Sequence, residues 1–137
     1  MRPMLAIVLA GVLAAPLVAA QQTKPAPPQT AAPAAASKNV QTMAGILMRL
    51  NHFPSDAEKA TLKGIVDNKA ATEGERTVAQ ALINLQHKVA AADQPKLQAL
   101  VKDAKTPESI QTLSSIILSL NHTPSDADKD RLKKIAS

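Results

Sequence analysis

The sequence feature that most constrains the fold is a stretch that occurs twice. LNHFPSDAEK begins at residue 50, and LNHTPSDADK begins seventy residues later, at residue 120. Aligned at this offset, residues 41–67 and 111–137 agree at 14 of 27 positions. A weaker third copy at residues 76–102 places the Leu-Gln-His that ends at His87 opposite the Leu-Asn-His that ends at His52. The chain therefore repeats every 35 residues, which is typical of supersecondary units that bury their apolar faces against one another.

Each unit is predicted to contain two short helices. Apolar residues recur at helical spacing in the first helix, as in Met43, Ile46 and Leu47, and again in the second, as in Leu62 and Ile65. The predicted fold class is all-α, with six short helices in three hairpins of about residues 38–70, 71–105 and 106–137. Two arrangements fit: an open helical-repeat stack, or a compact bundle with approximate threefold symmetry. Tetratricopeptide and pentatricopeptide arrays have similar periods, but their signature residues are missing, so the sequence assigns no family.

The repeated stretch is interpreted as the turn between the two helices of a unit. Its proline blocks continuation of the first helix, and Ser55 and Ser125 are expected to cap the second helices. The histidine is expected in the last turn of the first helix, where it interacts with unpaired carbonyl groups. In the middle unit Val89 replaces the proline, so a longer turn is expected there, with Asp93 as the cap.

The N-terminal part is predicted to lie outside the repeat domain. Residues 1–20 have the charged start, apolar run and small residues of a secretory signal peptide. The apolar run has about sixteen residues, fewer than the ~20 that a membrane span needs. Residues 21–37 are rich in alanine and proline, as in a flexible spacer. The prediction is an exported protein, periplasmic or extracellular, without a membrane span after cleavage and with a domain at residues 38–137.

Composition argues against several classes of function. Cysteine is absent, which removes disulfides and thiol nucleophiles, and Phe53 is the only aromatic residue. The net charge of +5, or +4 once Arg2 leaves with the signal, comes from interspersed charges without a long basic run. Nucleic-acid binding is therefore not expected. No catalytic or cofactor motif is present, so the chain is predicted to be non-enzymatic and to carry no cofactor.

The candidate metal ligands are His52, His87 and His122, which are all the histidines of the chain and occupy one position of the repeat. Imidazole is the commonest metal ligand in proteins. Three ligands of one zinc ion must each lie about 2 Å from it, whereas packed helices are about 8–10 Å apart. Equivalent positions of an open stack therefore cannot share an ion, and only closure about a threefold axis would bring them together. This is the alternative hypothesis: a periplasmic protein that binds a metal ion or haem through the three histidines.

The preferred hypothesis from the sequence rests on a second apolar row. Met48, Ile83 and Leu118 occupy one repeat position away from the main apolar stripe. Such a row is either covered by neighbouring repeats or forms a contact surface. The sequence therefore predicts an exported, non-enzymatic module that binds a protein partner or copies of itself.

Overall fold

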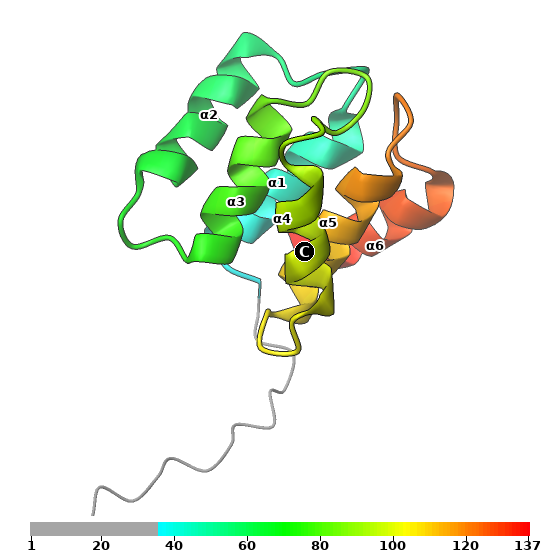
Figure 1. Ribbon diagram of the computed structural model, residues 1–137. Coiled ribbons are helices and arrows are strands. Elements are labelled where there is room, and N and C mark those ends of the chain that lie inside the picture. Colours follow the sequence, from blue (N-terminus) through cyan, green and yellow to red (C-terminus); the bar gives the residue numbers. More distant parts are fainter. Residues whose placement is uncertain (1–35) are drawn as a thin grey trace, which may run out of the picture. The chain divides into compact units, whose positions relative to one another are not determined.

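The computed structural model describes residues 36–137; the predicted signal peptide and nearly all of the predicted spacer lie outside this range. Within it the chain forms six helices, shown in Figure 1: α1 (Lys38–Arg49), α2 (Asp56–Asp67), α3 (Glu73–Ile83), α4 (Gln94–Lys102), α5 (Glu108–Ser119) and α6 (Asp126–Ala136). All named elements of residues 36–137 are helices, which confirms the all-α prediction. None of these helices has the length and apolar character needed to cross a membrane.

The second helices of the outer units have the predicted caps. In α2, Ser55 Oγ accepts from the Glu58 amide at 3.3 Å, while the Glu58 carboxylate accepts from the Ser55 amide at 2.9 Å. Thr72 and Glu75 form the same reciprocal pair at the start of α3, and Ser125 caps α6. These side chains satisfy amides that have no partner within the first turn of a helix.

Two helix starts have no side-chain cap. α5 follows Pro107, and the Thr106 hydroxyl before it donates to the Asp103 carboxylate at 3.1 Å. Asp93 precedes α4, as expected, but its side chain makes no capping hydrogen bond. The turn before α4 spans residues 84–93, and is longer than the turn at residues 50–55, as predicted.

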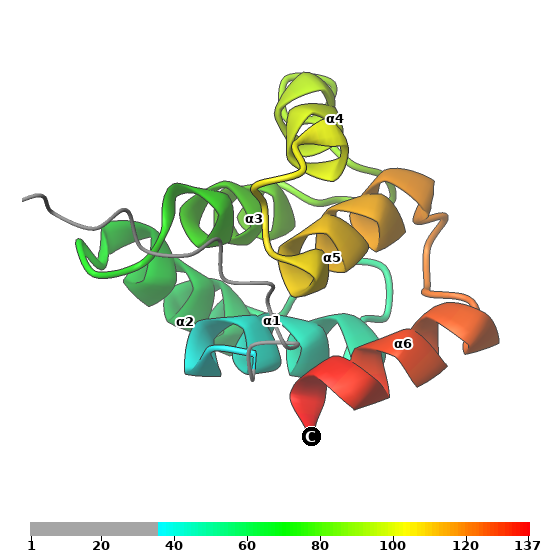
Figure 2. The ribbon, with the colours of Figure 1, turned by 90° about the horizontal axis from the view of Figure 1, so that it is seen from below.

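The helices pair between units more than within them. The second helix of each unit packs along the first helix of the next: α2 along α3, α4 along α5, and α6 back along α1. The two helices of one unit have far less contact with each other. Because α6 returns to α1, the three units close into a ring, as Figure 2 shows. The structure therefore has the compact arrangement and not the open stack.

The core repeats the same positions in all three units. The first helices α1, α3 and α5 contact one another inside the ring. At one position of these helices the structure has small side chains that are completely buried, Ala44, Ala79 and Ser114, which is compatible with close approach of the helices. The second helices each bury one leucine completely, Leu62, Leu97 and Leu132. Each unit thus contributes equivalent residues to one shared core, as the 35-residue period predicts.

One buried carboxylate breaks the equivalence. Glu75 occupies the repeat position of Val40 and Ile110 and is only 5% exposed. It accepts hydrogen bonds from the Ser37 hydroxyl and, at 2.7 Å, from the Thr72 amide, so it links the starts of α1 and α3. Burial alone would raise the pKa of Glu75, but these hydrogen bonds to the charged form, with others from the Thr72 and Asn39 side chains, hold the pKa below its ordinary value of 4.5.

Candidate functional site

The three histidines meet where the turns of the three units converge. The ring centroids of His52 and His87 are 5.7 Å apart, those of His52 and His122 are 5.5 Å apart, and those of His87 and His122 are 5.2 Å apart. All three side chains are exposed to solvent. Closure of the ring of units therefore produces the arrangement that the sequence analysis made the condition for a shared site.

The local backbone explains how the outer histidines reach this place. α1 ends at Arg49 and α5 ends at Ser119, and the following leucine of each turn is extended. His52 then has a φ of 79° and His122 a φ of 72°. The histidines thus lie beyond the helices, so the expectation of a helix-terminal histidine is wrong. The cause is that the first helix ends before the Asn-His pair instead of within it.

This backbone conformation is costly for a residue with a side chain. Positive φ is uncommon outside glycine, although Asn, Asp and His adopt it more often than other residues. At His122 the Thr123 amide also donates to the Asn121 carbonyl at 3.0 Å across a three-residue turn. A γ-turn with positive φ at its centre is rare and strained. Two of the three histidines therefore occupy positions where glycine would relieve strain.

Backbone hydrogen bonds also connect the three turns directly. The His52 amide donates to the His122 carbonyl at 3.3 Å, and the His122 amide donates to the His87 carbonyl at 3.2 Å. Turns from distant parts of the sequence are thus joined through the histidine residues themselves. The backbone atoms that carry the three imidazoles are therefore fixed relative to one another.

The rings are close together but do not converge on one point. They lie edge to face, with interplanar angles of 80°, 72° and 77°. In these side-chain conformations, no group of three or more His, Asp or Glu side chains among residues 36–137 is placed to hold a metal ion. The three imidazoles are thus close together, but in these conformations they are not oriented to share an ion.

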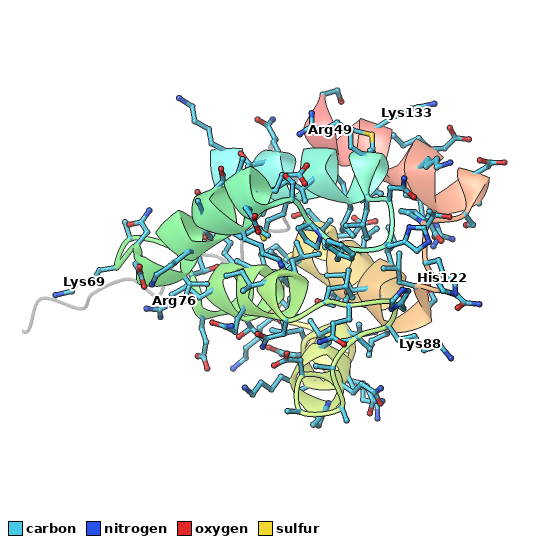
Figure 3. The ribbon with its side chains drawn as sticks, turned by 90° about the horizontal axis from the view of Figure 1, so that it is seen from above. Arg49, Lys69, Arg76, Lys88, His122 and Lys133 are labelled. Carbon is cyan, nitrogen blue, oxygen red and sulfur yellow. The ribbon has the colours of Figure 1, made fainter. Side chains whose placement is uncertain are left out.

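The middle unit forms a hollow beside two of the histidines. The hollow has a volume of about 460 Å³ and is lined by Asn84, Gln86, His87, Lys88, Val89, Ala90 and His122. Asp93 at the end of the longer turn is 3% exposed, and its carboxylate accepts a hydrogen bond from the Asn84 side-chain amide at 2.9 Å. Figure 3 shows Lys88 and His122 at the same end of the domain.

Lys88 is a residue of this region that the sequence analysis did not select. It directly follows His87, at the repeat position occupied by Phe53 and Thr123 in the outer units. The available signal was this departure from the repeat, which changes an aromatic or hydroxyl side chain to a cation next to a candidate ligand. A single sequence gave no reason to connect that change with a site.

The second predicted set of residues lies elsewhere in the structure. Met48, Ile83 and Leu118 are half-buried and pack against the hydrophobic core, so part of their apolar surface is covered within the domain. The large apolar side chain with the greatest exposure in residues 36–137 is Phe53, at 55%, with the Lys59 ammonium 5.5 Å from its ring centroid. Association with a protein partner or with further copies of the chain stays a prediction.

No protein-family model, no curated protein and no solved structure matches this chain. The candidate site therefore rests on the geometry of the three histidines and their surroundings.

Proposed function

We propose that the protein binds one divalent transition-metal ion through His52, His87 and His122. The observation that carries the proposal is the separation of the three ring centroids, 5.2–5.7 Å. A Zn–N bond of about 2.0–2.1 Å plus about 1.1 Å from nitrogen to ring centroid places centroids about 5.1–5.5 Å apart around one tetrahedral or trigonal ion. Two of the three observed separations fall in this range, and the His52–His87 separation of 5.7 Å is slightly larger.

The step that binding requires is a rotation of the rings. Rotation about the Cβ–Cγ bond leaves the centroid nearly in place and turns both ring nitrogens, and this torsion is broad for histidine. The three side chains are exposed, so solvent rather than packed side chains surrounds much of each ring. Reorientation toward an ion therefore requires no rearrangement of the core.

The hydrogen-bonded backbone of the three turns also supports the proposal. The hydrogen bonds between His52, His122 and His87 hold the three ligand-bearing residues together before an ion arrives. Such preorganisation reduces the entropy that binding would otherwise lose. Residues kept in strained backbone conformations are concentrated at functional sites, and His52 and His122 have this property.

The chemical type of the three ligand atoms limits which metal ions the site would bind. Three neutral imidazoles offer nitrogen ligands only, and the sequence contains no cysteine thiolate. Imidazole suits zinc, copper and nickel, whereas calcium and magnesium prefer oxygen ligands. Three protein ligands leave at least one coordination position for water or another ligand. The proposed activity is therefore reversible binding of a zinc-like ion at an open site.

Titration calorimetry with zinc tests the proposal, using protein without a histidine tag. We expect one ion per chain with micromolar or tighter affinity, and a melting temperature that rises with zinc concentration, because binding to the folded form stabilises it. His52→Asn, His87→Asn and His122→Asn should each weaken binding by at least about 100-fold, beyond the usual effect of losing an outer partner of a metal site.

The asparagine variants separate binding from folding. Asparagine tolerates positive φ. When zinc is absent, the free energies of unfolding of His52→Asn and His122→Asn should therefore lie within about 1 kcal/mol of the wild-type value. Thr123→Ala is the matched control, because it changes the residue next to His122 and removes no imidazole. Zinc affinity that is unchanged in all three asparagine variants, or that is no tighter than millimolar in the wild type, would disprove the proposal.

A further inference from the structure

The ring of units is closed by a contact between distant parts of the chain. α6 packs along α1 (Figure 2) and makes far less contact with α5 of its own unit. Leu132 of α6 is completely buried, and the Gln41 side-chain amide of α1 donates to the Ser137 carbonyl at 3.3 Å. The position of α6 therefore depends more on its contacts with α1 than on its connection to α5.

A contact of this kind can also join two copies of the chain. The packing of α6 on α1 repeats that of α2 on α3 and of α4 on α5, in which the second helix of one unit packs along the first helix of the next. Such a head-to-tail contact joins two different surfaces, so it closes a ring within one chain or passes to a second chain with the same residues packed. The surface of α1 that receives α6 thus also fits the α6 of a second copy.

The turn between α5 and α6 has the properties of a hinge for this exchange. Asn121, His122 and Thr123 of the turn are exposed, so a change in their conformation uncovers no core. His122 has a φ of 72°, and an extended hinge relieves this unfavourable conformation. Short hinges under strain favour the exchange of the element that follows them. Pro124 directly after the hinge prevents α5 and α6 from merging into one helix.

Two backbone hydrogen bonds favour the closed monomer. The His122 amide donates to the His87 carbonyl at 3.2 Å, and the His122 carbonyl accepts from the His52 amide at 3.3 Å. An extended hinge breaks both. The closed monomer is therefore expected in dilute solution, and the exchange should increase with protein concentration, because it requires two chains.

From these observations we infer that two copies of the chain exchange their α6 helices, so that α6 of each copy packs along α1 of the other. The partner is a second copy of the same chain, and the product is a symmetric dimer of two complete rings. The exchange uses contacts that the monomer already contains. This inference goes beyond the proposed metal binding and does not depend on it.

The first measurement is the mass of the protein after refolding. The chain from Gln21 onward is refolded from urea at low and at high protein concentration without added metal, and size exclusion with light scattering separates the species. We expect monomer alone after dilute refolding and an additional dimer after concentrated refolding. Monomer alone at both concentrations overturns the inference.

An engineered cross-link identifies the exchanged helix. In the double variant Gln41→Cys with Ser137→Cys, a short bismaleimide joins the first turns of α1 to the end of α6, and the chain has no other cysteine. We expect links between chains in the dimer fraction and links within one chain in the monomer fraction, distinguished on a denaturing gel. Each single variant is a control, because it cannot form the link from α1 to α6. A dimer fraction that is linked only within single chains associates through its outer surface and overturns the inference.

Glycine variants compare the hinge with its counterpart in the first unit. Glycine adopts positive φ without strain, so His122→Gly stabilises the closed turn. It should lower the equilibrium constant for dimer formation about tenfold, because each dimer contains two hinges. His52→Gly is the matched control, since His52 has a similar φ of 79° in a turn that the exchange leaves closed, and its dimer formation should be unchanged. An effect of His52→Gly as large as that of His122→Gly would overturn the assignment of α6 as the exchanged helix.

Discussion

The turns of the outer units and the turn of the middle unit reach the same point by different backbone routes. In the outer units a short turn places His52 and His122 at positive φ, and the buried prolines Pro54 and Pro124 follow. In the middle unit a longer turn carries His87 without positive φ, and Val89 is buried at the proline position. The ring centroids of the three histidines nevertheless lie 5.2–5.7 Å apart.

This difference shows that the histidine cluster is not a by-product of one turn motif. If the histidine were present only because it suited the short turn, a turn with another conformation would have no need of it. The middle turn lacks the proline and the serine cap but carries the histidine, together with the buried leucine two residues before it. The leucine and the histidine are thus common to all three turns, and of these the exposed histidine is the residue that the proposed metal binding requires.

The largest effect on stability is expected when one complete unit is removed from the ring. Deletion of residues 106–137 removes α5 and α6, which pack against α4 and α1. In a closed ring this exposes core on both remaining units, so the shortened chain should lose cooperative thermal unfolding, followed by far-ultraviolet circular dichroism. In a linear stack a terminal unit is dispensable. A shortened chain that still melts in one sharp transition would contradict closure.

The next prediction compares the starts of the second helices. Asp93→Ala in the middle unit should cost about 2 kcal/mol, because it removes a buried carboxylate that accepts a hydrogen bond from the Asn84 side-chain amide at 2.9 Å and lies 3.7 Å from the Lys96 ammonium. Ser55→Ala and Ser125→Ala remove ordinary caps and should each cost about 1 kcal/mol. Urea unfolding at pH 7 measures all three. Equal losses in the three variants would show that the middle turn has no special support.

A smaller effect is expected at the buried carboxylate of the middle unit. Because the folded-state pKa of Glu75 is lowered, its contribution to stability is complete above the ordinary value of 4.5 and is lost as the pH falls through the lower folded value. Glu75→Gln should therefore lower stability by about 1 kcal/mol at pH 7 and weaken the loss of stability below about pH 4.5. Urea midpoints from pH 7 to pH 3 measure this. A variant with the same acid dependence as the wild type would contradict the account.

The smallest effect concerns Ser114 in the third unit. Its hydroxyl is buried and has no hydrogen-bond partner among residues 36–137, while Ala44 and Ala79 occupy the same position in the other units. Ser114→Ala should therefore stabilise the protein by about 1 kcal/mol, because it removes an unsatisfied polar group from the core. The midpoint of thermal unfolding should rise by several degrees. A fall would mean that the hydroxyl makes a stabilising contact.

The repeat made much of this fold predictable. The 35-residue period located six helices, and the capping residues Ser55 and Ser125 located the starts of two of them. Local sequence did not determine which helices would pair, because the apolar faces of α2 and α3 fit either an open stack or a ring. The choice depends on whether α6 can reach α1, which is a property of the complete chain.

The sequence predicted which residues form the candidate site but not how the chain positions them. The sequence identified His52, His87 and His122 as equivalent residues and identified closure as the condition for their meeting. It placed them in the helix instead of the turn, because the positive φ at His52 and His122 has no sequence signal when glycine is absent. The hollow and Lys88 depend on how the middle turn folds, which the loss of proline indicated only as a difference in length.

X-ray absorption spectroscopy of the zinc-loaded protein tests the central claim most directly, because it counts the imidazoles bound to the ion. The account predicts three histidine nitrogens at about 2.0–2.1 Å in the wild type and two in His87→Asn loaded at high zinc concentration. The measurement compares this middle-unit variant with His122→Asn, for which the same reduction is expected. A spectrum with a single imidazole and otherwise oxygen ligands, unchanged in both variants, would show that the three units do not share one ion.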